Sequence, residues 1–356
     1  MSLLRLVVNN ATRRLGSMFP AYFGNQKHHH ARDFGYPEHV EFGLLWEAYR
    51  RNPLARAAVD KTVGKTWETL PYLQEFARDD GDDAPETTIE KAIRQRLADI
   101  RGWQVMMEAD RRAMVGGYAG VILRIADDRR FDEPVDSVRG GIDALVEIIP
   151  AWKGQLEVSE WDTDQASVTY GQPKMFQFNE ASVGDGRSQP RQFQLHPDRV
   201  VIWSEDGTVH ARSALEPGYN ALLDLDKIRG AGGEGFWKNA KSAPVLEVDA
   251  TTDIQQMAKA MGISPDEVLE KMNAQVEDWQ KGFDQLLMLQ GMKADTLQVQ
   301  LPSPEHFFAI ALQSFAASVQ VPLKILVGSQ TGERASTEDA DEWARVNMAR
   351  RTNLVV

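Results

Sequence analysis

The sequence contains no cysteine, so disulfide bonds and thiolate chemistry are both excluded. It has no apolar run near the roughly 18 residues that a membrane-spanning helix needs, which argues against a spanning role. Basic residues are outnumbered, and the formal net charge at pH 7 is −12. Because general nucleic-acid binders normally present a basic surface, this charge argues against broad avidity for nucleic acid. The negative charge does not exclude a protein that acts on DNA without binding it tightly.

The remaining composition is that of an ordinary globular protein. Hydrophobic residues make up 42% and charged residues 26% of the 356 positions, as in most globular domains. A chain of this length can bury a large core and is expected to hold more than one structural unit.

Charge is distributed unevenly along the chain. Met1–Arg32 holds five basic residues and no acidic one. Because this segment lacks the apolar core of a signal peptide, we interpret it as a terminal arm. Ala243–Ile310 holds eleven acidic and four basic residues, which accounts for more than half of the net negative charge.

Apolar spacing predicts three helices followed by a strand in the first third of the chain. The first helix is expected over 40–66, with a break near Pro53. The third begins near Trp103 and runs into Gly116-Gly117-Tyr118-Ala119-Gly120, after which VILRI is expected to be a strand. The second helix carries one apolar stripe, formed by Ile89, Ile93, Leu97 and Ile100.

The middle of the chain reads as short antiparallel strands separated by turn residues. Gly, Pro, Asn and Asp divide the region from Leu145 to Val209 into short runs rich in strand-forming residues. The expected strands are LVEIIP, QLEVSEW, SVTYG, KMFQFNE and RVVIWSE.

A helical pattern resumes after Glu216-Pro217-Gly218. Residues 242–262 then read as a short strand-and-turn insert. Ser264 and Glu267 have the spacing of a capping box, with proline at the first helical position, so another helix is expected there. The runs QLLMLQ, GMKAD and TLQVQL that follow suggest a hairpin.

The stretch from Val299 to Arg350 predicts a strand, a capped helix, a stop and a second helix. Ser303 can cap the first helix, with Pro304 in its first turn. Pro322 disfavours helical geometry at the preceding residue, so this helix should end there. Its apolar stripe is Phe308, Leu312, Phe315 and Val319.

Motifs for catalysis or cofactor binding are weak. Gly230, Gly232 and Gly235 satisfy G-x-G-x-x-G, but the residues before them look helical, whereas a dinucleotide site needs a preceding strand. A glycine-rich bend or a close helix–helix approach fits better. Gly64-Lys65-Thr66 lacks the first glycine of a P-loop. The consecutive His28, His29 and His30 have no partner at metal-ligand spacing, so neither a metal nor a cofactor site is expected.

The order of several segments resembles the portal proteins of tailed bacteriophages. It is most similar to the portal-like family formerly catalogued as a phage domain of unknown function. The matching segments span about Phe42 to Arg350. They are LLWEAYRRNPLARAAVDKTVGKTW, MEADRRAMVGGYAGVILRI, YGQPKMFQF, LHPDRVVIW, FWKNAKSAPVLEV and the stretch containing VPLKILVG.

The resemblance implies an α+β portal fold that closes into a ring of subunits. Mapped onto this sequence, it divides the chain into seven segments. These are an N-terminal arm (1–40), a wing of helices then antiparallel strands (41–221), a first stem helix (222–241), a clip (242–263), a second stem helix (264–282), a wing return with a tunnel loop and long helix (283–330), and a crown-proximal helix expected to be incomplete (331–356).

The resemblance also implies a structural protein with no catalytic residues, cofactor or metal. About twelve copies would form a ring at a capsid vertex of the virion, assembled in the host cytoplasm, with double-stranded DNA passing through it. Its partners would be terminase, head-to-tail adaptor proteins and the major capsid protein or scaffold, and no membrane. The tunnel loop would comprise Leu301, Pro302, Ser303, Pro304, Glu305 and His306. The docking residues of the clip would be Ala243, Pro244, Glu247, Asp249 and Asp253.

Two other functions stay open from the sequence alone. One is a phage nuclease or phosphoesterase that shares a portal-like segment, against which the absence of clustered metal ligands and of a His-x-Thr pair argues. The other is an adaptor or scaffold that binds only protein, for which a channel too narrow for a DNA duplex would be the sign.

Overall fold

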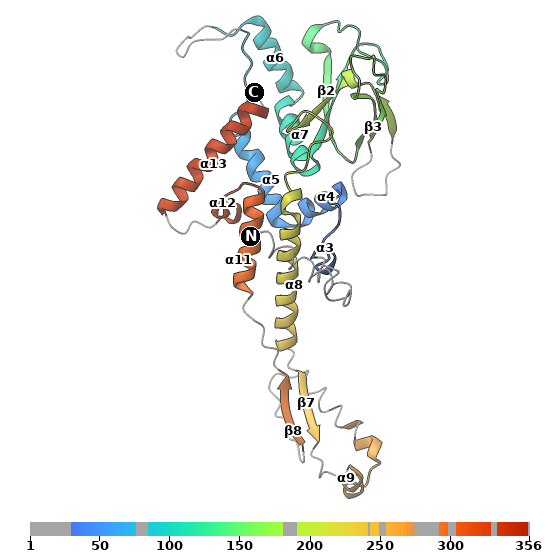
Figure 1. Cartoon of the computed structure of the whole chain (residues 1–356), viewed down its shortest axis with the longest axis vertical. Coiled ribbons are helices and arrows are strands. Elements are labelled where there is room, and N and C mark those ends of the chain that lie inside the picture. Colours follow the sequence, from blue (N-terminus) through green and yellow to red (C-terminus); the bar gives the residue numbers. More distant parts are fainter. Residues whose placement is uncertain are drawn as a thin grey trace, which may run out of the picture. The chain divides into compact units, whose positions relative to one another are not determined.

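The structure, a computed structural model, describes residues 30–75, 85–180, 191–240, 243–248, 254–268, 270–271, 274, 292–297, 304–328 and 333–354. It contains two compact units. One comprises Met1–Leu223 and Leu312–Val356, and the other comprises Asp224–Ala311. The elements are shown in Figure 1.

The helices at the start of the first unit confirm the prediction for 40–66. After the short α3 (His30–Asp33), α4 (Phe42–Arg51) and α5 (Pro53–Thr66) are separated at Asn52. The break is stabilised locally, because the Asn52 side chain accepts a hydrogen bond from the Leu54 backbone N–H at 3.0 Å. Proline at the first position of α5 costs nothing, since that N–H has no partner within a helix.

Helices α6 (Thr88–Asp99) and α7 (Gly102–Gly116) also match their predictions. A capping box between Thr87 and Glu90 starts α6. The predicted apolar stripe of this helix is only partly correct, because Ile89 is 56% exposed. α7 is followed by Gly117, whose φ of 94° favours glycine, and a Cβ there would lie 2.2 Å from the Ala211 carbonyl oxygen.

Three strands form the sheet that packs against α7. They are β1 (Tyr118–Ile125), β2 (Leu145–Trp152) and β6 (Val200–Ser204), in the antiparallel order β2-β1-β6. The central strand contains the predicted VILRI run. It is buried over its first five residues because its two faces are both covered.

A second antiparallel sheet consists of β3 (Leu156–Trp161), β4 (Pro173–Asn179) and β5 (Gln192–Leu195), in that order. Its apolar face packs against the first sheet, with Leu156, Phe176 and Leu195 buried beside Ile122 and Ala151. The opposite face of the first sheet is covered by Ala109 and Ala113 of α7, which pack against Val121 of β1 and Ile148 of β2. The alternation of Val121 and Ile122 between these two cores follows the two-residue period of a strand.

The predicted strand SVTYG is wrong, because these residues form an exposed turn between β3 and β4. Asp162 organises the turn: its carboxylate accepts hydrogen bonds from the Asp164 N–H and from the Thr169 hydroxyl, at 3.0 and 2.7 Å. Aspartate competes in this way for backbone donors that a strand would need. Val168 is fully exposed in consequence. Strand β5 was not predicted.

Short 3₁₀ turns and three C-terminal helices complete the first unit. The turns are η1 (Gly141–Ala144), η2 (Pro197–Arg199) and η3 (Glu216–Gly218). The helices are α11 (Glu305–Ser318), α12 (Leu323–Val327) and α13 (Glu333–Leu354), of which α11 starts in the second unit. The predicted apolar stripe of α11 is confirmed, since Phe315 is fully buried and Phe308, Leu312 and Val319 are partly buried. The predicted end before Pro322 is also confirmed.

The second unit contains most of α8 (Tyr219–Ala240), β7 (Ala243–Val248), α9 (Ile254–Met261) and β8 (Met292–Leu297). The capping box at Ser264 and Glu267 is confirmed by both of its hydrogen bonds. Two predictions need correction. The insert at 242–262 contains the helix α9, and β8 pairs with the distant β7. The run QLLMLQ lies outside the described residues.

Candidate functional site

The residues predicted for the clip fall on β7 and beyond it. Ala243, Pro244 and Glu247 belong to β7, which pairs with β8 in an antiparallel register that places Glu247 opposite Lys293. Asp249 and Asp253 lie outside the described residues. Proline has no N–H to donate, so it is tolerated where a strand has no neighbour on one side to accept that hydrogen bond. Both strands of a two-stranded sheet are edge strands of this kind. The docking role of these residues stays a prediction.

The residues predicted for the tunnel loop lead into α11. Leu301, Pro302 and Ser303 lie outside the described residues. Pro304 precedes α11, and its carbonyl oxygen accepts the helical hydrogen bond from the Phe308 N–H at 2.9 Å. Glu305 and His306 begin the helix, where an acidic side chain is favourable near the positive end of the helix dipole. The loop assignment itself stays a prediction.

The glycine-rich motif lies within the regular helix α8. Because Gly230, Gly232 and Gly235 are inside the helix and no strand leads into them, the dinucleotide reading fails on its structural requirement. A Cβ added at Gly230 or Gly232 would meet nothing within 4 Å, so no part of the described chain closely approaches these positions.

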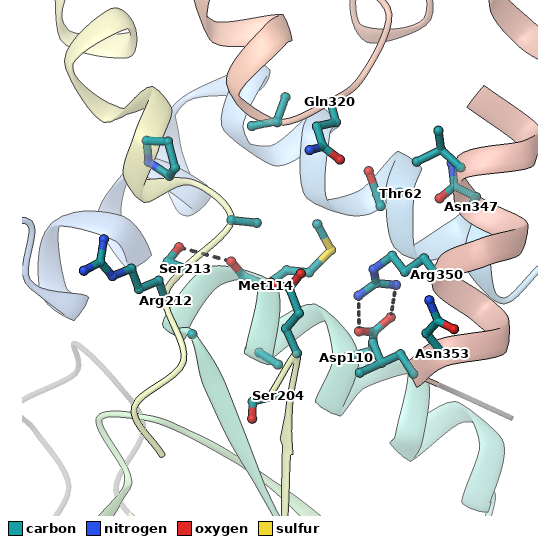
Figure 2. A pocket seen from close by; sticks show the side chains of 18 of the residues that line it. Thr62, Asp110, Met114, Ser204, Arg212, Ser213, Gln320, Asn347, Arg350 and Asn353 are labelled. Atoms are coloured by element: carbon teal, nitrogen blue, oxygen red, sulfur yellow. Dashed lines mark hydrogen bonds and ion pairs between the residues drawn. The ribbon is translucent and has the colours of Figure 1, made fainter. Parts of the chain in front are cut away.

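A pocket of about 500 Å³ lies in the first unit, between α5, α7, α13 and the segment after β6 (Figure 2). Thr62 contributes from α5, and Asp110 and Met114 contribute from α7. Arg350 reaches it from α13, and Trp203 from β6. Ser318 at the end of α11 and Gln320 beyond it also line the pocket, which therefore marks a place where elements far apart in sequence meet.

Asp110 is the centre of the polar network that joins these elements. Its carboxylate is completely buried and forms a bidentate ion pair with Arg350, whose Nη1 is 2.9 Å from Oδ2. Two indole N–H groups also donate to it: Trp67 at 2.9 Å and Trp203 at 3.3 Å. Arg350 donates further to the Thr66 hydroxyl at 2.9 Å. A buried charge of this kind is tolerated only when it is paired and hydrogen-bonded.

The chemistry of this network is that of a structural joint. Four N–H groups already donate hydrogen bonds to the Asp110 carboxylate, which has about four acceptor sites. Little of the carboxylate is therefore left to act as a general base toward a substrate. Within the described residues, no group of three or more His, Asp or Glu side chains is arranged to hold a metal ion. Over the same part of the chain, no helix combines the length and apolar character needed to cross a membrane.

The joint was not found by sequence reasoning, because Asp110 and Arg350 are 240 residues apart. One local signal was available. Asp110 lies between Ala109 and Ala113, the two residues of α7 that pack against the first sheet, and a charged residue so close to a buried face requires a partner. The sequence does not indicate which of its many arginines supplies that partner.

Comparison with known families decides the relationship. A family model described as phage portal protein matches residues 45–353. The chain belongs to the phage portal protein family. The match includes α4 through α13, so both units of this portal family member are covered. No match is found among curated proteins.

Solved structures with a similar fold come from gene transfer agent (GTA) particles. A chain from the neck of a native GTA particle, computed with C12 symmetry, is 12% identical, with 85% of this chain and 74% of that chain covered and a TM-score of 0.51. A chain from the neck of an empty GTA particle, computed with C6 symmetry, is 13% identical, with 82% and 71% covered and a TM-score of 0.50. A chain from the virion of a native particle is 12% identical, with 86% and 88% covered and a TM-score of 0.47. At such identities the likeness of the first two shows a shared fold.

Proposed function

We propose that this protein forms the ring at a capsid vertex through which double-stranded DNA is packaged and later ejected. The observation that carries the proposal is the match of the portal family over residues 45–353. Further support comes from the fold shared with a neck chain of a particle computed with C12 symmetry, which favours about twelve copies here. A ring of this kind uses heterologous interfaces that close upon themselves.

Within this proposal the second unit supplies the stem and the clip. α8 would be the first stem helix, and the helix that starts after Ser264 would be the second. The hairpin-like pair β7 and β8, with α9, would form the clip that docks terminase and then the head-to-tail adaptors. The first unit would form most of the wing, facing the major capsid protein or scaffold.

The charge of Ala243–Ile310, which makes up most of the second unit, supports passage of DNA in preference to binding. Ala243–Ile310 has eleven acidic and four basic residues, so its surface repels phosphate. At moderate salt this repulsion is screened over about 10 Å, so it acts only where DNA comes close to the wall. Within the described residues the absence of a metal cluster gives the nuclease alternative no specific support.

The test is the oligomeric state of the purified full-length protein. Electron microscopy of the protein at high concentration should show rings with a central hole wide enough for a DNA duplex, and light scattering should give a mass of about twelve subunits. A stable monomer under these conditions would contradict the proposal. A ring with a channel too narrow for DNA would favour the protein-only adaptor instead.

A further inference from the structure

α13 is attached to the rest of the first unit mainly by polar contacts. Among its described side chains, residues 338–354, only Asn347 is buried. Two apolar side chains of α13 that line the pocket, Trp343 and Leu354, are half-buried. Val346 and Met348 are 43% and 60% exposed. Burial of apolar surface is the main source of helix docking energy, so α13 gains little from it.

The polar contacts are few and lie on one side of the helix. Arg350 pairs with Asp110 and donates to Thr66. One helical turn earlier, the Asn347 side-chain oxygen lies 3.3 Å from the same Thr66 hydroxyl, and its amide donates to the Trp343 carbonyl at 2.8 Å. Figure 2 shows Asn347, Arg350 and Asn353 together on the side of α13 that borders the pocket. The helix thus depends on one charged contact and its immediate neighbours.

Asp110 and Thr66 form the seat of α13, and both keep hydrogen-bond partners when the helix is absent. Asp110 would retain the indole N–H groups of Trp67 and Trp203, both of which come from the core. The Thr66 hydroxyl would retain the Thr62 carbonyl, to which it donates at 2.9 Å. The large penalty for an orphaned buried group is therefore reduced here. The Arg350 guanidinium, released from Asp110, would be hydrated by solvent.

The helix beneath α13 has its own apolar core. Ala55, Val59 and Val63 of α5 are completely buried, and α5 packs against α4 and α7 as well as α13. α7 in turn packs on the sheet through Ala109 and Ala113. Loss of α13 would leave these contacts in place, so the rest of the first unit can persist without it.

We propose that α13 is a latch that detaches from its seat as a unit while the remainder of the first unit stays folded. The Asp110–Arg350 pair is the catch, and detachment exposes Thr66 together with Thr62 and Asp110, two of the residues that line the pocket. The latch is a separate claim from the ring, because it concerns an equilibrium within one chain.

Native-state hydrogen exchange of the full-length protein tests the latch directly. Amides of residues 338–354 should exchange faster than those of α7 and β1, at a rate that is insensitive to low denaturant concentrations. Exchange in α7 and β1 should instead accelerate with denaturant, because it requires exposure of far more surface. Equal protection and equal denaturant sensitivity in all three elements would overturn the proposal.

A pair of variants tests the catch. Arg350→Gln should accelerate exchange in residues 338–354 by about tenfold or more, as expected for loss of a hydrogen bond to a charged group, and should leave α7 and β1 unchanged. Arg345→Gln is the matched control, since Arg345 is exposed on the same helix, and it should leave exchange in α13 within about twofold of wild type. Acceleration spread evenly over α13, α7 and β1, or equal effects of the two variants, would show that Arg350 belongs to the global core.

Discussion

Asp127 and Arg199 form an ion pair in which each side chain is only 1% exposed and the charged atoms are 2.7 Å apart. The Arg199 Nε also donates to the Glu133 carbonyl at 3.2 Å. The pair therefore connects the segment after β1 to the turn η2 before β6. Burial opposes ionisation of Asp127, but the hydrogen bond from Arg199 and backbone donors outweigh it and lower the pKa of its carboxyl.

This pair predicts a large loss of stability in the variant Asp127→Asn. Removing the carboxylate leaves the buried Arg199 guanidinium without its counter-charge, at a cost of about 3–5 kcal/mol. Because the folded-state pKa of Asp127 is lowered, the stability it supplies is present above its unfolded pKa of about 3.9 and is lost as pH falls through the folded value. Urea denaturation should therefore show a large difference between wild type and variant at pH 7, and a smaller one in acid.

The neighbouring residue provides the control for this measurement. Asp128 is exposed and has a φ of 57°, a conformation that asparagine tolerates well. Asp128→Asn should change the free energy of unfolding by no more than about 0.5 kcal/mol. If Asp127→Asn were equally mild, or if its effect did not shrink in acid, the pair would not have the role assigned to it.

Single residues also explain where the sequence was misleading. Alternation alone favours a strand at SVTYG, yet the Asp162 carboxylate accepts from Asp164 and Thr169 and closes a turn. Pattern methods weigh side-chain hydrophobicity, whereas this outcome depends on one side chain competing for nearby donors. Asp110 is a similar case at long range, because its role depends on a partner 240 residues away.

At the scale of elements, α8 contains four glycines in six residues, from Gly230 to Gly235. Each glycine in a helix interior costs about 0.5–1 kcal/mol relative to alanine. A Cβ at Gly232 would meet nothing within 4 Å, so no contact in the described chain compensates for this cost. The glycines are thus a weakness of the isolated helix.

We expect Gly232→Ala to stabilise α8 by about 0.5–1 kcal/mol. Slower amide exchange over 224–240 and a rise in helical circular dichroism would measure the gain. Gly218→Ala is a contrasting substitution, because its Cβ would lie 2.2 Å from the Ser318 Oγ and 2.7 Å from the Phe315 ring. Overpacking there should cost about 1–3 kcal/mol. A destabilised Gly232→Ala protein would show that α8 has a close neighbour in the assembled state.

Elements defined by local patterns were predicted well, and elements defined by distant partners were not. The break between α4 and α5, the end of α7 and the capping box at Ser264 all depend on residues within a few positions of one another. The pairing of β7 with β8 joins segments about fifty residues apart, and the residue pattern within either strand does not indicate its partner. The helix α9 was hidden for another reason, since eight residues between turn-forming neighbours give too short a pattern to recognise.

At the scale of the whole molecule, the order of the portal-like segments along the chain indicated the family better than any single segment did. Each portal-like segment is short, but together they run in the family order from about Phe42 to Arg350, and the family match covers 45–353. Composition contributed through charge, because an acidic chain is poorly suited to broad binding of nucleic acid. The tunnel loop and clip came from the resemblance alone.

The tunnel loop gives the prediction that tests the conduit itself. Replacing residues 301–306 with six glycine and serine residues keeps the connection into α11 and removes the side chains proposed to reach DNA. Because Phe315 and the other buried anchors of α11 lie further along the helix, rings should still assemble. Particles built with the variant should package or retain less nuclease-protected DNA than particles built with wild type.

A matched replacement at residues 162–172 separates loss of the loop from a general effect of glycine substitution. This turn is exposed and lies between β3 and β4 on the first unit, away in sequence from every segment assigned to the channel. Under the proposed function its replacement should leave packaging close to wild type. Collapse of the ring in the 301–306 variant would instead place those residues in a subunit interface. Normal packaging by that variant would mean that the side chains of 301–306 do not act on the DNA, and that the charge of the channel wall must be tested in their place.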